Sequence, residues 1–339
     1  MAIYERHEWL GQRVEEAIDP NQHIVDPHHH LWDRDGSTYL APELIVDTRA
    51  SHNVTHTVFV ECNASYDADA DAAFAPVGET RFVAEQAAAV TRTDTRIAAI
   101  VGHADFTLGP QLDDVLAAHV DAGDGLFRGI RHGVNWSPFD DVKNGHHNPE
   151  QHQLAAPGFR DGVRRLAAKD LSFDAWLYFD QLVELADLAR AIPECTIVVN
   201  HLGGPLGIGP HATHRAEMQE TWRAGIAAVA ACPNVVLKVG GIGMEHYFGT
   251  PWTGLDAPPS SEQAADYWSD MVRFAIDMFG PHRAMFESNF PVDRQTLPYT
   301  VLWNAFQIMA SGYTESERHD LFAATAARTY RITGVSGVS

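Results

Sequence analysis

The feature that most constrains the fold is a regular alternation of short β-branched runs with helical patterns. Eight such runs are expected to be strands, and their starts lie about 25–50 residues apart. This spacing is typical of strand–helix–strand units, in which a helix returns the chain to the start of the next parallel strand. Eight units favour an α/β fold of the closed (β/α)8 TIM-barrel type over an open doubly wound sheet. The expected strands are residues 24–30, 57–63, 97–105, 127–132, 171–177, 196–201, 235–240 and 284–291.

Helical patterns fill the intervals between these runs. A capping box, Thr314-Glu315-Ser316-Glu317, starts a last helix that is expected to reach about residue 332. No linker, repeat or low-complexity tract divides the 339 residues, so we expect one barrel domain over 24–334, with an N-terminal extension (1–23) and a tail (335–339). The other expected helices are residues 79–91, 111–122, 156–169, 181–191, 215–231 and 263–278.

Three long segments rich in Gly, Pro and His follow expected strands, at residues 133–157, 203–214 and 241–259. In a barrel of this type they emerge from the carboxyl ends of the strands, where the chemistry is placed. We therefore expect them to form the walls of a substrate site.

Composition and charge exclude several classes of partner. The net charge of −21 argues against nucleic acid and against an anionic membrane surface. No apolar run approaches the roughly 20 residues that span a bilayer. The first 18 residues are charged and lack the features of a signal peptide, so a cytoplasmic protein is expected. The expected partner is a small-molecule substrate, and a homodimer is compatible with such a barrel.

The sharpest local signal is Asp26-Pro27-His28-His29-His30 at the end of the first expected strand. On a regular strand Asp26, His28 and His30 share one face, because side chains alternate. Two imidazoles on one inward face at the mouth of a barrel can bind a single divalent cation.

Several strand-end motifs together resemble one family. In chain order the sequence is similar to the branch of the amidohydrolase superfamily (amidohydrolase-2 type) that contains sugar-acid lactonases and pyrone dicarboxylate lactonase. The similarity runs from about residue 24 to 332. The motifs are DPHHHLWD (26–33), FRGIRH (127–132), NHLGGP (200–205), VVLKVGG (235–241) and FESNFPVD (286–293).

The resemblance implies hydrolysis of a lactone or similar cyclic ester. It gives His28, His30 and His201 the roles of catalytic groups and metal ligands. One divalent metal is then expected, with zinc or manganese favoured, and it would polarise the carbonyl or activate water. A metal-free route, in which the same histidines hydrogen-bond the carbonyl, stays open.

The sequence departs from the family pattern at three positions. The family's last strand usually ends in Ser-Asp-Trp-Pro, where the Asp is a ligand or base, whereas this chain has Asn289. Because an amide cannot take a proton, Glu287 and Asp293 are the replacement candidates for the catalytic base. Asn200 replaces the usual Asp before His201, and Phe179 stands where relatives often have a histidine or arginine.

Five residues are candidates for substrate binding. Arg131 is suited to a carboxylate or a lactone carbonyl, because a guanidinium group binds such groups with two parallel hydrogen bonds. Glu61, at the end of the second strand, could bind a hydroxyl group or complete a metal site. The others are Trp32 and Tyr178, as aromatic walls, and Asn289.

Two alternatives to lactone hydrolysis remain. A neighbouring branch of the superfamily decarboxylates aromatic acids without an oxidant, although it normally uses the aspartate that Asn289 replaces. The substitutions at 179, 200 and 289 also fit a barrel that binds a small molecule without turning it over.

Overall fold

Eight parallel strands form a single sheet at the centre of the molecule. The computed structural model describes residues 6–34, 36–90 and 95–335. The strands follow one another around the sheet in chain order, and each pairs with the next in parallel. They are β1 (His23–His29), β4 (Asn53–Val60), β5 (Arg96–Gly102), β6 (Phe127–Gly133), β7 (Ser172–Trp176), β8 (Ile197–Val199), β9 (Val235–Val239) and β10 (Ala284–Phe286).

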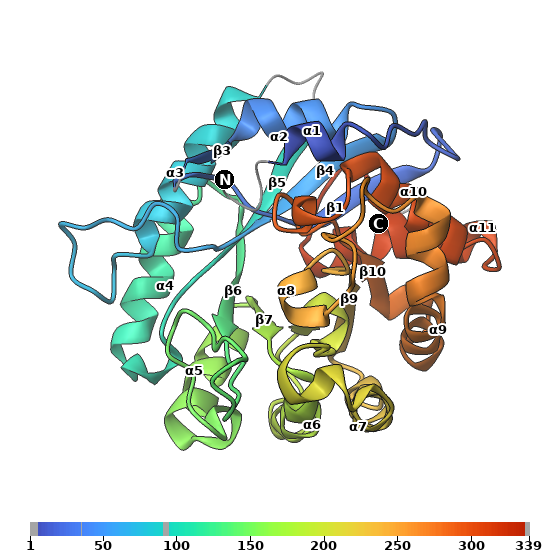
Figure 1. The fold of residues 1–339 in the computed structure, drawn as a ribbon. Coiled ribbons are helices and arrows are strands. Elements are labelled where there is room, and N and C mark those ends of the chain that lie inside the picture. Colours follow the sequence, from blue (N-terminus) through green and yellow to red (C-terminus); the bar gives the residue numbers. More distant parts are fainter. Residues whose placement is uncertain (1–5, 35, 91–94, 336–339) are drawn as a thin grey trace.

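The first and last strands meet and nearly close the sheet into a barrel (Figure 1). The backbone amide of His30 donates to the carbonyl oxygen of Phe290 at 2.7 Å, and that of Asn289 donates to the carbonyl oxygen of His28 at 2.9 Å. These bonds lie just beyond the ends of β1 and β10. The closure brings the histidine motif of β1 next to the segment that follows β10, and the TIM-barrel prediction is confirmed.

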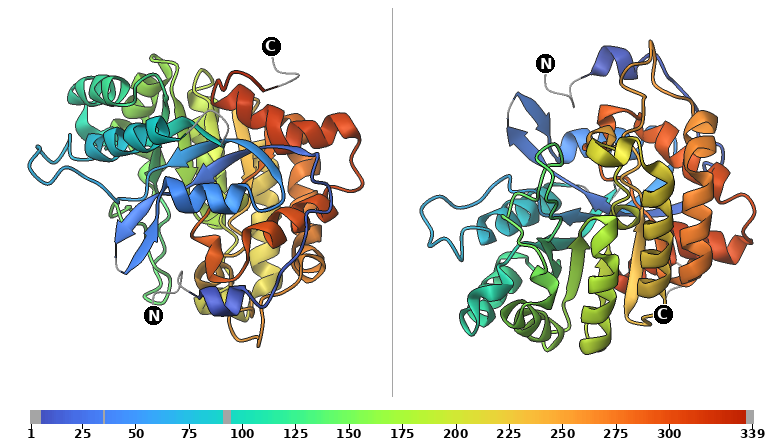
Figure 2. Two further views of the ribbon diagram at one scale, coloured as in Figure 1. Left: turned by 90° about the horizontal axis from the view of Figure 1, so that it is seen from above. Right: turned by 60° about the horizontal axis from the view of Figure 1, so that its bottom comes forward.

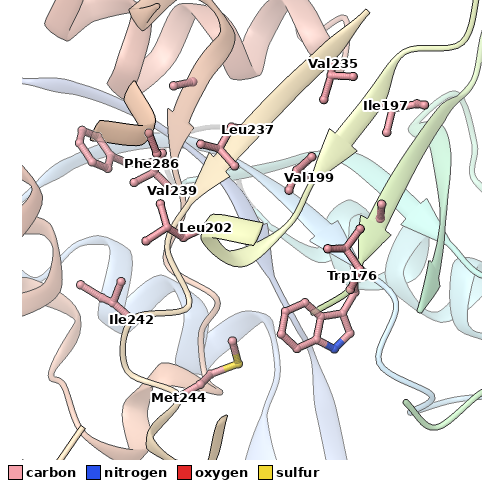
Figure 3. Packing of buried hydrophobic residues seen from close by; sticks show 14 of the residues in the cluster. Trp176, Ile197, Val199, Leu202, Val235, Leu237, Val239, Ile242, Met244 and Phe286 are labelled. Carbon is pink, nitrogen blue, oxygen red and sulfur yellow. The ribbon is translucent and has the colours of Figure 1, made fainter. Parts of the chain in front are cut away.

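Helices cover the outer face of the barrel (Figures 1 and 2). Branched side chains such as Val199, Leu237 and Val239 fill the space around the strands (Figure 3). The Ser260 side chain starts α9 by accepting a hydrogen bond from the backbone of Gln263, as an N-cap residue does. The helices of this layer are α3 (Val77–Ala89), α4 (Gln111–Ala122), α5 (Pro157–Ala167), α6 (Leu182–Ala191), α7 (Arg215–Ala230), α9 (Ser261–Phe279) and α10 (Tyr299–Met309).

Several segments differ from the sequence predictions, and the eighth strand, expected over 284–291, ends at Phe286. The second strand was expected at 57–63 but runs over 53–60, because the amides of Cys62 and Ala64 bind the Glu79 carboxylate instead of a neighbouring strand. Helix α10 was not predicted. A hairpin of β2 (Trp32–Arg34) and β3 (Ser37–Tyr39) precedes α2 (Ala41–Thr48). The last helix, predicted over 314–332, is divided into α11 (Glu315–His319), a π-helical turn and α12 (Thr325–Thr329).

The two ends of the described chain pack against the barrel. The Trp9 indole donates to the carbonyl oxygen of Leu255 at 2.9 Å, and the amide of Ile18 donates to the Asn304 side chain at 3.0 Å. At the other end, Tyr330 packs in a cluster with strand residues such as Val58. Within the described residues, no helix has both the length and the apolar character needed to cross a bilayer.

Candidate active site

Two histidines at the end of β1 lie side by side inside the rim of the barrel. The ring centroids of His28 and His30 are 4.9 Å apart, and both side chains are buried. Nδ1 of His30 lies 2.8 Å from the carbonyl oxygen of Val60, so Nδ1 carries the proton and Nε2 keeps its lone pair. Burial lowers the pKa of both imidazoles well below the usual value, which leaves them neutral at neutral pH.

Asp26 leaves the face that it was expected to share with the two histidines. The pairing of β1 with β4 shifts register after Asp26. Its carboxylate accepts hydrogen bonds from the Tyr299 hydroxyl on α10, at 3.0 Å, and from the amide of Ser288, also at 3.0 Å. Burial nevertheless raises the pKa of Asp26 to about 6. Asp26 therefore joins β1 to α10 and to the end of β10, outside the histidine cluster.

His201, two residues after the end of β8, completes the histidine cluster, and Glu287 joins it to His28. The rings of His201 and His28 are 4.6 Å apart. Oε1 of Glu287 accepts hydrogen bonds from Nδ1 of His201 at 2.8 Å and from its backbone amide at 3.0 Å. Oε2 lies 2.6 Å from Nδ1 of His28. Nε2 of His201 therefore keeps its lone pair, and burial lowers the pKa of this imidazole too.

Arg131 on β6 forms a buried ion pair with Glu61, which follows β4. Nε of Arg131 donates to Oε1 of Glu61 at 2.8 Å, and its Nη2 donates to the backbone carbonyl of the same residue. Burial alone would raise the pKa of the Glu61 carboxyl, but the guanidinium holds that pKa well below its usual range. The remaining nitrogen, Nη1, lies 3.4 Å from Nε2 of His28, so Arg131 adds a fixed positive charge to the histidine cluster.

Asn289 and Asp293 form a second polar pair next to His30. Oδ1 of Asn289 lies 3.2 Å from Nε2 of His30, and its Nδ2 donates to Oδ1 of Asp293 at 2.8 Å. Asp293 also accepts a bond from the amide of Gly243 at 2.8 Å, and burial raises its pKa well above the usual value. Asn289 has a φ of 54°, in the left-handed region that asparagine tolerates better than most residues.

A buried ion pair lies beneath the histidine cluster. Nζ of Lys238 lies 2.8 Å from Oδ2 of Asp174, and neither side chain is exposed. The Tyr330 hydroxyl donates to the same oxygen at 2.8 Å, and the side-chain Nδ2 of Asn200 does so at 3.2 Å. Asp174 and Tyr330 were not recognised from the sequence as part of the site. A carboxylate between two aromatic or apolar residues, Phe173 and Ala175, in a fully buried strand was the signal that could have identified Asp174.

A cavity of about 170 Å³ opens among these groups, lined by His30, Arg131, His201 and Asn289. Glu287 and Asp293 are buried behind this lining. Pockets for drug-sized ligands have volumes of roughly 300–1,000 Å³, so this cavity suits a smaller ligand. Trp176, the last residue of β7, and Met244, which follows β9, are labelled in Figure 3, and both line the cavity. Other walls come from Trp32, Arg34, Lys143, His246 and Tyr247.

The sequence profile of the amidohydrolase family matches residues 25–332, almost the whole described barrel. The chain belongs to the amidohydrolase family. It is 33% identical over 331 residues to the uncharacterized protein y4mH of Sinorhizobium fredii, covering 91% of this chain and 98% of that one. It is 28% identical over 325 residues to an L-fucono-1,5-lactonase of Burkholderia multivorans, with 91% and 96% covered. A Burkholderia multivorans amidohydrolase solved with bound zinc shares the fold, with a TM-score of 0.69, 24% identity and coverage of 91% and 99%.

The side chains of this amidohydrolase fit a divalent cation. Donor atoms of His28, His201 and Glu287 lie within 4.8 Å of one another. Oε2 of Glu287 is close to His28 but not aligned for a hydrogen bond, and no other described group bonds to it. The nearby buried cations, Arg131 and Lys238, are already paired with other carboxylates. A buried carboxylate without a full counter-charge normally pairs or coordinates a metal, so the donor set suits one.

The long loop after β6 also reaches the site. Nε2 of His146 and Nε2 of His147 lie 3.4 and 3.3 Å from Oε2 of Glu61. Tyr178, expected as an aromatic wall, is buried behind this loop, where its hydroxyl donates to the backbone of Lys143. Tyr247, on the short helix α8 (Glu245–Phe248) that follows β9, lines the cavity instead.

Proposed function

We propose that this amidohydrolase opens a lactone or a similar cyclic ester by adding water to the carbonyl carbon. One observation carries the proposal: the unprotonated Nε2 of His30 borders a small cavity beside the Arg131 guanidinium and the amide oxygen of Asn289. The lactonase relatives at 27–28% identity support this class of reaction.

His30 is the general base in this proposal. Its Nε2 takes a proton from water while the water oxygen attacks the carbonyl carbon. Both protons of the resulting imidazolium have acceptors, because Nδ1 faces the carbonyl oxygen of Val60 and Nε2 faces Oδ1 of Asn289. Asp293 holds the Asn289 amide in this orientation. When the tetrahedral intermediate collapses, the ring C–O bond breaks and the leaving oxygen takes the proton back from His30.

Arg131 is proposed to stabilise the negative charge that develops on the carbonyl oxygen. Its guanidinium is fixed by Glu61, so it need not reorganise when that charge appears. Trp32 and Asn289 border the substrate in this arrangement, and Glu61 acts only through Arg131.

His28, His201 and Glu287 would hold a divalent cation, for which zinc and manganese are the expected candidates. Such a cation supplies Lewis-acid polarisation of the carbonyl. Glu287 also orients both imidazoles through their Nδ1 atoms. Glu287 and Asp293, expected as bases, are both proposed to act through neighbours, because neither lines the cavity.

The test is hydrolysis of a panel of five- and six-membered lactones, followed by proton release. The protein is assayed as purified, after removal of metal, and after resupply of zinc or manganese. Turnover in at least one of these states is expected. No hydrolysis in any state would refute the proposal, and release of carbon dioxide from hydroxybenzoates would favour decarboxylation in its place.

A further inference from the structure

The charge of the cavity is opposite to that of the whole protein. The chain has a net charge of −21, yet the described residues that line the cavity include Arg34, Arg131 and Lys143 and no Asp or Glu. Arg131 is neutralised by Glu61, whereas neither Arg34 nor Lys143 forms an ion pair with a described carboxylate. Within residues 6–34, 36–90 and 95–335, two positive charges without a carboxylate partner therefore line a small cavity of an acidic protein.

Arg34 has its guanidinium held in one orientation by backbone hydrogen bonds and by an aromatic ring. Its Nη1 donates to the carbonyl oxygens of Cys62 and Asn63, at 2.8 and 2.9 Å, and its guanidinium lies 5.1 Å from the centre of the Trp32 ring. These bonds use one nitrogen of the guanidinium. A guanidinium that is already oriented loses less entropy when it binds a carboxylate.

Lys143 enters the cavity from the loop after β6, opposite the segment that carries His246. Burial and the charge of Lys143 both lower the pKa of His246, which places the ammonium group within electrostatic reach of that wall. The backbone of Lys143 is fixed by the Tyr178 hydroxyl, while its side chain is exposed. Arg34, at the end of β2, and Lys143, from the loop after β6, thus share one cavity.

We propose that the substrate carries a carboxylate, which Arg34 and Lys143 bind while the ester carbonyl faces His30 and Arg131. Positively charged clefts concentrate anionic ligands, and a guanidinium matches a carboxylate in geometry. The substrate class is then a small lactone with an acid group outside the ring. The placement of the ring rests on the proposed function, whereas the anion site does not.

A matched pair of substrates tests this inference. D-glucaro-1,4-lactone and D-glucono-1,4-lactone differ only in carrying a carboxylate or a hydroxymethyl group. We expect kcat/KM to be about tenfold or more higher for the acidic lactone, mainly through KM. Arg34→Gln and Lys143→Gln should each reduce this preference several-fold. Arg164→Gln, which removes an exposed charge from α5, should leave it unchanged.

Binding of D-glucarate, measured by calorimetry, separates the anion site from the reaction. One outcome is that D-glucarate binds, that Arg34→Gln weakens this binding about tenfold, and that neither lactone is hydrolysed. That outcome would support the anion site and contradict the proposed function. Equal kcat/KM for the two lactones would refute the anion site and leave lactone hydrolysis standing. Lys143→Gln keeps the test decisive if Arg34→Gln does not fold, because Lys143 is exposed.

Discussion

Three neighbouring imidazoles of this amidohydrolase differ in the group that fixes their protons. A backbone carbonyl holds the Nδ1 proton of His30, whereas Glu287 lies against Nδ1 of both His28 and His201. Nε2 is left unprotonated in His30 and His201, and of these two only His30 has the Asn289 oxygen beside it. This difference gives His30 an acceptor for a second proton, and no sequence spacing could reveal it.

Replacing His30 with Asn should lower kcat by about 10²–10⁴-fold, the usual contribution of a general base. The base must be neutral, and burial lowers its pKa well below 6.5. The kcat/KM of the wild type should therefore be level near pH 7 and fall only on the acid side of 6.5. His152→Asn, at an exposed position outside the cavity, is the matched control. A His30→Asn variant with normal kcat would remove His30 from the reaction.

Replacing Arg131 with Met should destabilise the fold as well as impair catalysis. The change leaves the Glu61 carboxylate buried without its guanidinium, and breaking a buried ion pair on one side costs about 3–5 kcal/mol. The double variant Arg131→Met/Glu61→Leu should recover part of this loss. Urea unfolding of the three proteins measures the difference. Equal stability of the single and double variants would show that the lost charge is not the cause.

At the scale of elements, the strands were the most predictable part of the fold. Each expected strand overlaps an observed one, because most of these buried parallel strands contain a run of apolar residues. Helix α10 was missed because it is buried on most sides and has no polar face to mark a helical period. The start of β4 was missed because Asn53, Thr55 and His56 resemble loop residues.

The candidate site was predictable where strands carry it and not where loops do. His28, His30 and His201 follow strands of a known order, so their convergence followed from the barrel. Of the two expected aromatic walls, Trp32 lines the cavity, whereas Tyr178 is covered by the loop after β6 and Tyr247 lines the cavity in its place. Loop paths depend on contacts that a sequence pattern does not encode.

Glu79 links α3 to the end of β4 and gives this element a pH dependence. Burial raises its pKa from 4.5 to about 7, so the folded state binds a proton that the unfolded state has lost. Stability from this group is present below pH 4.5 and is lost as the pH rises through 7, a cost of about 3 kcal/mol. Glu79→Gln lacks this titration, so its stability relative to wild type should rise between pH 4.5 and 8.

Urea unfolding at the two pH values measures the effect, and the exposed Glu85→Gln on the same helix is the control. The comparison uses the change with pH, because the new amide adds a constant difference at both values. A relative stability of Glu79→Gln that is the same at pH 4.5 and pH 8 would contradict the raised pKa.

At the scale of the whole molecule, one charge distribution has two opposing consequences. The net charge of −21 makes the folded state repel itself, while Arg34 and Lys143 give the cavity a positive lining. Salt screens both the repulsion within the folded protein and the attraction of anions to the cavity, since the Debye length falls from about 30 Å at 0.01 M to about 10 Å at 0.1 M. Raising NaCl over this range should therefore increase the free energy of unfolding, measured with urea.

The same salt increase should lower kcat/KM for D-glucaro-1,4-lactone and leave that for D-glucono-1,4-lactone nearly constant, because only the first is attracted by the cavity charge. Salt is expected to raise the free energy of unfolding while it lowers kcat/KM for the acidic lactone, so unfolding of the protein cannot account for the fall in kcat/KM. A free energy of unfolding that falls with salt would mean that favourable ion pairs, such as Arg294 with Asp47, outweigh the repulsion.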